Sequence, residues 1–375
     1  MSGPAHPALA TRRRRWPLFL PFALVVLLAA GWTAVWFYAA ARAEQEIASF
    51  REREFKAGRL QDCASQSIGG YPFRIEVRCG AATFTFNGTP TVELKLPSVL
   101  AAVQVYDPGL LIAEFSGPLN VSEPGRAPAY VVNWSLGQAS ARGLPSKIAR
   151  ASLALDKPTV RDTSIIGNGN DTVFRAQRLE LHGREAAGST PGNPSIDTVV
   201  RVNGGVADKL HPILAKPIDA EVAAVLRGLT DVTPKPWPVR FREWQAHDGE
   251  LEIVKARLQQ EDVIAVGAGT LKLTPRGALD GNLQVTVVGI EKVLKMLDIE
   301  RFMSEGQIGA TINALDKLIP GLGGIARQNA APGLVAALGQ RTVLEGKQAV
   351  AFPVRFNDGA VSLGPFQVGV LPPLF

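Results

Sequence analysis

The chain has 375 residues, of which 46% are hydrophobic and 20% are charged, and its formal net charge is +6. Four of the positive charges come from an arginine cluster near the amino terminus, which leaves the remainder of the chain only slightly basic. Because no basic cluster recurs after residue 42, nucleic-acid binding is set aside as a function class. The chain is longer than one compact core normally requires, so we expect either two domains or one elongated sheet.

Residues 16–41 contain no charged side chain. At about 1.5 Å per residue, a helix of this length spans roughly 39 Å, and the hydrocarbon core of a bilayer is about 30 Å thick. The run directly follows four consecutive arginines, Arg12, Arg13, Arg14 and Arg15. Since cytoplasmic flanks collect arginine, we expect residues 1–15 to be a cytoplasmic basic stub and residues 16–41 to be a transmembrane signal anchor.

A cleaved signal peptide is the alternative to an anchor, because Ala39, Ala40 and Ala41 supply small residues directly before Arg42. The apolar region of a signal peptide is normally only about 7 to 15 residues long, and the run observed here is much longer. We therefore favour an uncleaved single-pass anchor.

The two cysteines, Cys63 and Cys79, lie beyond the anchor, in the part of the chain that we expect to be exported. In an oxidising compartment, two cysteines are most simply a disulfide. A metal site and a nucleophile are the alternatives, but two sulfurs cannot complete a tetrahedral site and no histidine lies near them in sequence. A loop of this length predicts a stabilisation of about 3 kcal/mol in the chain-entropy model.

The hydrophobic pattern divides the exported part of the chain. Residues 42–70 begin with a charged stretch that has a narrow apolar face, so we expect a helical stalk there. From residue 71 onward the pattern alternates; residues 73–79, for example, are apolar at odd positions and charged at even ones. A hairpin is legible around residues 267–287, where both strands show one apolar and one polar face.

These patterns predict a mainly β (α+β) protein. We expect an N-terminal transmembrane helix followed by a large, repetitive antiparallel sheet of β-hairpins, with a few helices packed on it. The β-rich domain would cover residues 71–375. A subdomain boundary near residue 235 stays open, because Pro234, Pro236 and Pro238 surround Trp237.

Helical spacing of apolar residues interrupts the alternating pattern in a few places. It predicts helices over residues 206–229, 290–303 and 307–318, with a short one near residues 333–338. Proline should break or kink the first of these at Pro212 and Pro217. These helices would cap the sheet or line an apolar groove.

No catalytic or metal-binding pattern is found in the sequence. His182, His211 and His247 stand alone, without the spacing that metal sites require. Nucleophile elbows and phosphate-binding loops are absent as well. The sequence therefore predicts no catalytic residue, no metal ligand and no cofactor.

One short motif and three further segments resemble a known family. The motif is Gly70, Tyr71, Pro72, Phe73 and Arg74, which leads to Cys79. The segments are residues 247–249, the hairpin around residues 267–281, and residues 358–374. Together they resemble a bacterial membrane-anchored family, the domain of unknown function number 2125, over about residues 45–375.

This resemblance implies a Gram-negative cell envelope and no established activity. Together with the orientation expected from the arginines, it predicts a bacterial inner-membrane protein with a cytoplasmic amino terminus and a periplasmic body. More loosely, one amino-terminal helix followed by successive hairpins is similar to the architecture of AsmA-like envelope proteins, which are associated with moving lipids between membranes. Architecture alone does not establish function.

Two hypotheses from different classes follow. In the first, the sheet and the helices after residue 290 form a groove that binds or conveys a lipid or another apolar ligand in the cell envelope. In the second, the protein is a structural or scaffolding module whose apolar face is fully packed and holds no ligand. The sequence does not predict protein partners.

Overall fold

The computed structural model describes residues 16–88, 90–144, 147–163, 171–190, 192–233, 235–296, 339–363 and 366–375. Its first element is the helix α1 (Trp16–Lys56), which is long and apolar enough to cross a membrane. No other helix of the described residues meets that criterion. Pro17 stands in the first turn of α1, where the missing amide donor costs least, and Pro21 lies inside the helix.

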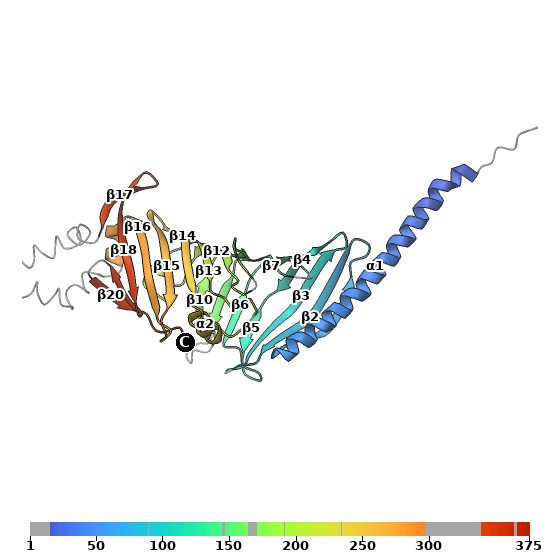
Figure 1. The fold of residues 1–375 in the computed structure, drawn as a ribbon, viewed down its shortest axis with the longest axis horizontal. Helices are drawn as coiled ribbons and strands as arrows, with labels where there is room; N and C mark the ends of the chain where they lie inside the picture. Colours follow the sequence, from blue (N-terminus) through green and yellow to red (C-terminus); the bar gives the residue numbers. More distant parts are fainter. Residues whose placement is uncertain are drawn as a thin grey trace, which may run out of the picture.

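The rest of the described chain is mainly one antiparallel sheet of 20 strands (Figure 1). The strands are β1 (Arg59–Gly69), β2 (Arg74–Phe86), β3 (Val92–Gln104), β4 (Asp107–Ser116), β5 (Leu119–Ser122), β6 (Tyr130–Asn133), β7 (Leu136–Arg142), β8 (Arg150–Asp156), β9 (Thr159–Asp162), β10 (Asp171–Arg175), β11 (Arg178–Glu185), β12 (Ile196–Gly205), β13 (Ile218–Arg227), β14 (Glu250–Gln260), β15 (Val263–Leu273), β16 (Leu279–Val288), β17 (Gln340–Leu344), β18 (Lys347–Asn357), β19 (Ala360–Leu363) and β20 (Phe366–Val370).

Strand pairing gives the sheet one continuous backbone ladder. Successive neighbours are β1, β2, β3, β4, β7, β8, β11, β12, β13, β14, β15, β16 and β18, after which β19 and β20 follow. The short strands β5, β6, β9 and β10 form a second series of pairs, which joins this ladder where β5 pairs with β3. Because β13 and β14 pair across residue 235, the sheet is continuous where a subdomain boundary was considered.

Between β3 and β12, long extended segments are each interrupted and divided into two strands. The interruption at Gly117 and Pro118 separates β4 from β5, and the one at Lys157 and Pro158 separates β8 from β9. Both prolines lack the amide donor that a continuous ladder would need. Between β6 and β7, the Trp134 indole donates to the Phe115 carbonyl oxygen at 2.9 Å. The interruptions therefore bend the strands while their polar groups still find partners.

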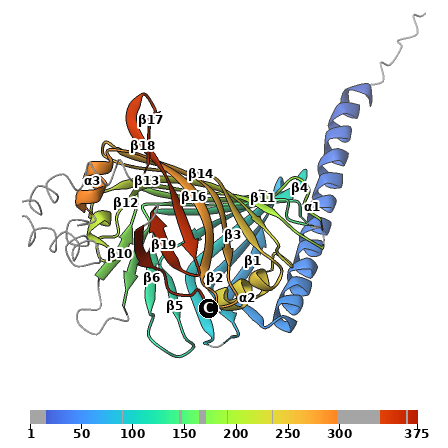
Figure 2. The same ribbon diagram turned by 60° about the vertical axis from the view of Figure 1, so that its left-hand side comes forward.

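The sheet is strongly curved (Figure 2). Adjacent strands twist by roughly 20 to 25°, so the six steps from β3 to β13 accumulate about 120 to 150°. This rotation brings the turn between β2 and β3 close to the segment before α2 (Trp237–Ala246): a Cβ on Gly88 would lie 3.4 Å from Cγ of Pro236. Pro238 stands in the first turn of α2, where proline is favoured.

Two predicted helical segments are wrong in whole or in part. The expected stalk over residues 42–70 is helical only to Lys56, and Arg59–Gly69 form β1. Residues 206–229 contain a single turn of 3₁₀ helix, Pro212–Ala215, followed by the strand β13. Tertiary pairing decides the structure there, because β13 pairs along its length with β12 on one side and with β14 on the other.

Of the remaining predicted helices, only the first lies partly within the described residues. Residues 290–296 form the helix α3 (Ile290–Met296), as expected for the start of the segment 290–303. The segments 307–318 and 333–338 lie outside the described residues, and so does the arginine cluster at residues 12–15.

Two glycines on the same face of the sheet give a matched test of this packing. A Cβ on Gly137 would lie 2.5 Å from Nε1 of Trp134 and 2.6 Å from Cε2 of Phe115, whereas a Cβ on Gly183 would meet only Ile196 at 3.7 Å. We expect Gly137→Ala to lower the free energy of unfolding by about 1–3 kcal/mol, because the two rings must move. Gly183→Ala should be neutral or stabilising.

Urea denaturation of the full chain in detergent, followed by circular dichroism, measures both effects. Equal effects of the two substitutions would contradict the packing described for Trp134 and Phe115.

Candidate functional site

One face of the sheet carries an unbroken row of apolar residues. In an antiparallel pair, directly opposite residues point to the same face, so the pairing registers show which side chains line up. The apolar row, one residue per strand from β2 to β18, consists of Val77, Ala101, Ala113, Ala139, Leu153, Leu181, Val200, Val222, Ala256, Gly267, Val285 and Phe352. At about 4.8 Å per strand, it extends for roughly 50 Å along the sheet.

The apolar row is open over most of its length. Of its twelve residues, only Phe352 is buried; ten are half-buried, and Leu181 is 44% exposed. In the row beside it, Leu258 is 42% exposed. A sheet face that is filled by its own chain would bury such side chains. The face that carries the apolar row, called the apolar face below, is therefore largely uncovered.

From β8 to β13, the opposite face of the sheet is charged, whereas at β15, β16 and β18 it carries a buried apolar cluster of Ile264, Val288 and Ala349. Arg178 bonds the carboxylates of Asp156 and Glu180, each at 2.6 Å, and Arg201 bonds Glu221 at 2.7 Å. The hydrogen bond that Arg178 donates to Glu180 raises the pKa of Arg178, and the one that Arg201 donates to Glu221 raises the pKa of Arg201. Exposed pairs of this kind contribute little to stability. They do distinguish a hydrated face from the apolar one.

The helix α2 covers one end of the apolar face. Trp244 of α2 packs in a buried cluster with Leu229 and Leu273, and its indole donates to the Arg227 carbonyl oxygen at 2.6 Å. Beside this cluster lies a pocket of about 640 Å³, the α2 pocket. Its walls include residues from three places: the strand ends that flank the β2–β3 turn, the strands β13 to β15, and α2. They include Phe86 and Val92, then Leu226, Leu251 and Leu271, and finally Trp237 and Phe241.

These walls come from strands far apart in the sheet, so the sheet curves toward its apolar face. The α2 pocket is thus an apolar cavity at one end of an apolar surface. Drug-sized apolar ligands occupy cavities of similar volume.

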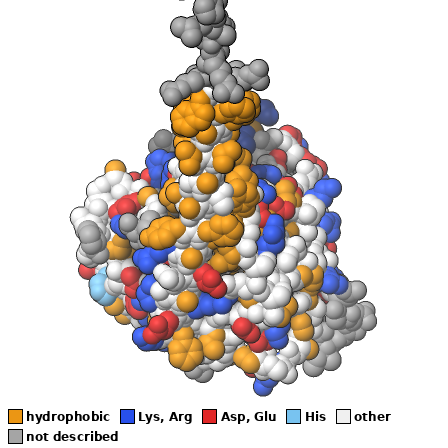
Figure 3. All heavy atoms as spheres, turned by 90° about the vertical axis from the view of Figure 1, so that its right-hand side faces the viewer, with side chains coloured by type: hydrophobic (Ala, Val, Ile, Leu, Met, Phe, Trp, Pro, Cys, Tyr) orange, Lys and Arg blue, Asp and Glu red, His pale blue; other side chains and the backbone are white. Residues whose placement is uncertain are grey.

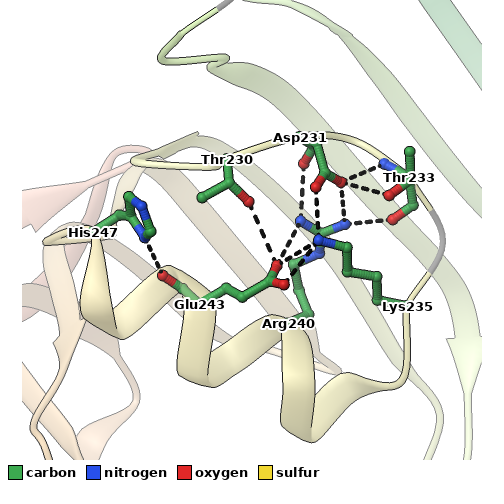
Figure 4. A network of polar contacts seen from close by, with 7 residues as sticks. All are labelled: Thr230, Asp231, Thr233, Lys235, Arg240, Glu243 and His247. Carbon is green, nitrogen blue, oxygen red and sulfur yellow. Dashed lines mark hydrogen bonds and ion pairs between the residues drawn. The ribbon is translucent and has the colours of Figure 1, made fainter. Parts of the chain in front are cut away.

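A polar network holds the segment before α2 on the helix (Figure 4). The Asp231 carboxylate accepts hydrogen bonds from Lys235 at 2.6 Å, from the Thr233 hydroxyl at 2.6 Å and from Arg240 at 2.9 Å. Lys235 also donates to both carboxylate oxygens of Glu243 at 2.8 Å. Two carboxylates and two cations therefore balance one another at the rim of the α2 pocket.

The pKa directions agree with this structural role. Partial burial opposes ionisation of Asp231, but hydrogen bonds from Lys235, Thr233 and Arg240 outweigh it and hold the pKa of Asp231 well below its usual value of 3.8. Hydrogen bonds to Asp231 and Glu243 raise the pKa of Lys235 above its usual 10.5. Asp231 and Lys235 thus stay charged near neutral pH. Their mutual contacts leave neither of them as an evident general acid or base.

The segment from Gly70 to Arg74, singled out in the sequence, lies where the sheet meets α1. The Trp32 indole donates to the Pro72 carbonyl oxygen at 2.8 Å, and the Trp36 indole donates to that of Arg74 at 2.9 Å. Tyr71 packs edge-on against Trp36, with ring centroids 5.4 Å apart. The motif Gly70 to Arg74 therefore forms the β1–β2 turn and joins the helix to the sheet.

The two cysteines lie on the same hairpin. Cys63 of β1 and Cys79 of β2 are joined by a disulfide, with Cα atoms 5.4 Å apart.

At Glu76, also in β2, the structure differs from the alternating pattern. This residue is 1% exposed, although its even position predicts a solvent-facing side chain. It forms ion pairs with Arg74 and Arg78, a burial that only the fold reveals.

His182, expected to stand alone, has two polar neighbours in the structure. Its Nδ1 lies 3.0 Å from the Ser152 hydroxyl, and its Nε2 lies 3.4 Å from Glu180. Strand register brings these residues together, which no sequence motif could show. The surrounding backbone belongs to the paired strands β7, β8 and β11, so its amide groups are engaged in the ladder instead of forming an oxyanion hole. In the described ranges, no group of three His, Cys, Asp or Glu side chains could hold a metal ion.

The polar network predicts a specific loss of stability. Asp231→Asn should lower the free energy of unfolding by about 1 kcal/mol, because three donors lose a charged acceptor. Since the folded pKa of Asp231 lies below 3.8, this contribution is present at higher pH and is lost as the pH falls below about 4. Because the folded pKa of Lys235 lies above 10.5, the contribution of its ammonium group to stability is present at neutral pH and is lost only as the pH rises past about 10.5.

The matched control is Glu252→Gln, which removes one exposed ion pair, to Arg227 at 2.7 Å, and should change stability by less than about 0.5 kcal/mol. Thermal unfolding at pH values from 9 down to about 2 checks both variants, and the wild-type advantage over Asp231→Asn should shrink progressively as the pH falls below about 4. An advantage that is the same at pH 7 and at about pH 2 would show that the carboxylate charge is not its source.

Comparison with protein families gives one match. The family model described as "Uncharacterized protein conserved in bacteria (DUF2125)" matches residues 36–372, which is most of the chain. Comparisons with curated proteins and with solved structures find no match, so they lend no support to the looser likeness to AsmA-like proteins. The matched region begins at Trp36 and includes the β1–β2 turn, the whole sheet and α2. The chain therefore belongs to the DUF2125 family of uncharacterized bacterial proteins.

Proposed function

We propose that this protein is an inner-membrane-anchored periplasmic module whose apolar face holds the acyl part of a lipid or a similar amphipathic molecule. The observation that carries the proposal is the open apolar row, which extends for roughly 50 Å across twelve strands. Each leaflet of a bilayer contributes about 15 Å of hydrocarbon, so the row is several acyl chains long.

The anchor is supported by the surface of α1. Figure 3 shows hydrophobic side chains covering the upper part of this helix, and Figure 1 shows this part projecting beyond the sheet. Only 6% of its most apolar window is buried against the rest of the chain. In water such a surface would be costly, and a bilayer would cover it. The arginines at positions 12–15 favour a cytoplasmic amino terminus and a body on the periplasmic side.

The contrast between the two faces of the sheet supports a ligand. The charged face has its ion pairs in place, while the apolar face keeps exposed aliphatic side chains such as Leu181 and Leu258. Contiguous apolar surface of this extent is rare on soluble monomers and usually marks an interaction site. A fully packed scaffold would bury these side chains. On the apolar face, side chains are buried near Trp244 and Phe352 and at Ile75 and Leu155.

Photo-crosslinking tests the proposal at adjacent residues of β11. A benzophenone amino acid at Leu181 faces the apolar row, whereas the same group at His182 faces the charged side. In the full chain, irradiated in intact membranes, we expect a covalent lipid adduct at Leu181 and little or none at His182. Mass spectrometry of the peptide that contains the crosslinker identifies the adduct.

A charge substitution gives an independent measurement. Here the benzophenone amino acid is placed at Leu258, and Leu181 is substituted. Leu181→Glu should reduce the lipid that the crosslinker at position 258 captures, because a carboxylate would be desolvated beside an acyl chain. His182→Glu should leave that capture unchanged. Absence of adducts at both Leu181 and Leu258 would favour the scaffold hypothesis.

A further inference from the structure

Exposed aromatic side chains gather at one end of the first strands. Tyr71 and Phe73, in the turn between β1 and β2, are 54% and 63% exposed, and Tyr106, between β3 and β4, is 68% exposed. A backbone hydrogen bond from the Val105 amide to the Phe73 carbonyl oxygen, at 3.0 Å, holds the two turns side by side. We call Tyr71, Phe73 and Tyr106 the aromatic tip.

The position of the aromatic tip along α1 is set by contacts. Pro72 accepts a hydrogen bond from Trp32, the Tyr71 hydroxyl lies 2.9 Å from that of Thr33, and the Phe73 ring centroid lies 6.4 Å from that of Trp32. If the hydrocarbon core begins just after the arginines, about 20 residues cross it and its far boundary falls near residue 35. The tip therefore contacts the helix at the level of that boundary.

The opposite end of the same strands differs in chemistry. The turn between β2 and β3 carries Asn87, Gly88, Pro90 and Thr91 at its described positions, and no aromatic residue. Trp and Tyr are enriched where a membrane meets water, because an apolar ring with a polar atom suits that boundary. Turn backbone cannot lie in the lipid-exposed hydrocarbon, since its polar groups would lack partners there.

We propose that the aromatic tip rests in the periplasmic interface of the same bilayer that α1 crosses, as a second contact between the sheet and the membrane. In Figure 1, α1 runs along the first strands of the sheet, and it contacts β1 and β2, which places this end of the sheet beside the anchor. The proposal rests on the anchor proposed above and does not require a lipid on the apolar face. It also places one end of the apolar face at the membrane surface, since Ile75 and Val103 follow the tip on that face.

Fluorescence depth measurements on the full chain in phospholipid vesicles test this surface. Three single substitutions each introduce one free thiol for an environment-sensitive label, with the native disulfide kept: Leu27→Cys in the middle of α1, Tyr106→Cys at the tip, and Val343→Cys in β17. All three positions are well exposed. The unsubstituted chain controls for labelling of the native cysteines. Quencher groups are placed on lipid headgroups in one set of vesicles and deep on acyl chains in another.

We expect the Tyr106→Cys label to be quenched most by headgroup quenchers, with blue-shifted emission, and the Val343→Cys label to be quenched by neither. The Leu27→Cys label should be quenched most by the deep set. If Leu27→Cys behaves so but Tyr106→Cys matches Val343→Cys, the aromatic tip does not touch the membrane and the anchor stands. If Leu27→Cys is not quenched, the anchor and the tip contact both fail.

Discussion

The structure depends on a single constraint, which is that one face of a long antiparallel sheet is apolar along its whole ladder. A flat sheet of this kind would expose that face completely. Twist prevents this, because it rotates successive strands until the β2–β3 turn meets α2 and the apolar side becomes the inner side. Trp244 then packs in a buried cluster with Leu229 and Leu273, while much of the apolar row stays uncovered. Burial is therefore concentrated near α2 and near Phe352, and the middle of the sheet is open.

The edges of the sheet follow from the same constraint. An edge strand offers unpaired backbone groups to other chains unless something covers it. Here α1 lies along β1, and Arg51 near its end donates to Gln66 of that strand. The disulfide between Cys63 and Cys79 ties β1 to β2 on the other side. The helix α1 thus shields the first edge of the sheet, and it is also long and apolar enough to serve as the proposed membrane anchor.

The sequence predicted those parts of the fold in which polarity alternates, and it missed those in which it does not. Residues 74–86 and the hairpin around residue 271 alternate clearly, and both form strands. In β13, Ala223 and Val225 are apolar although they lie opposite the apolar face, so the pattern resembles a buried helix as much as a strand. The strand β1 is largely polar, because α1 covers its edge and little of its surface is core. The apolar row itself could not be predicted, since it depends on strand order and register, which several similar segments leave open.

The most direct test of this account is an experimental structure of the full chain in a lipid nanodisc. The account predicts elongated density, which the protein does not explain, within contact distance of Leu181 and Val200 on the apolar face. It also predicts that this density continues along the row toward the end of the sheet beside α1. An apolar face that is covered by protein side chains along its length, with no such density, would contradict the central claim.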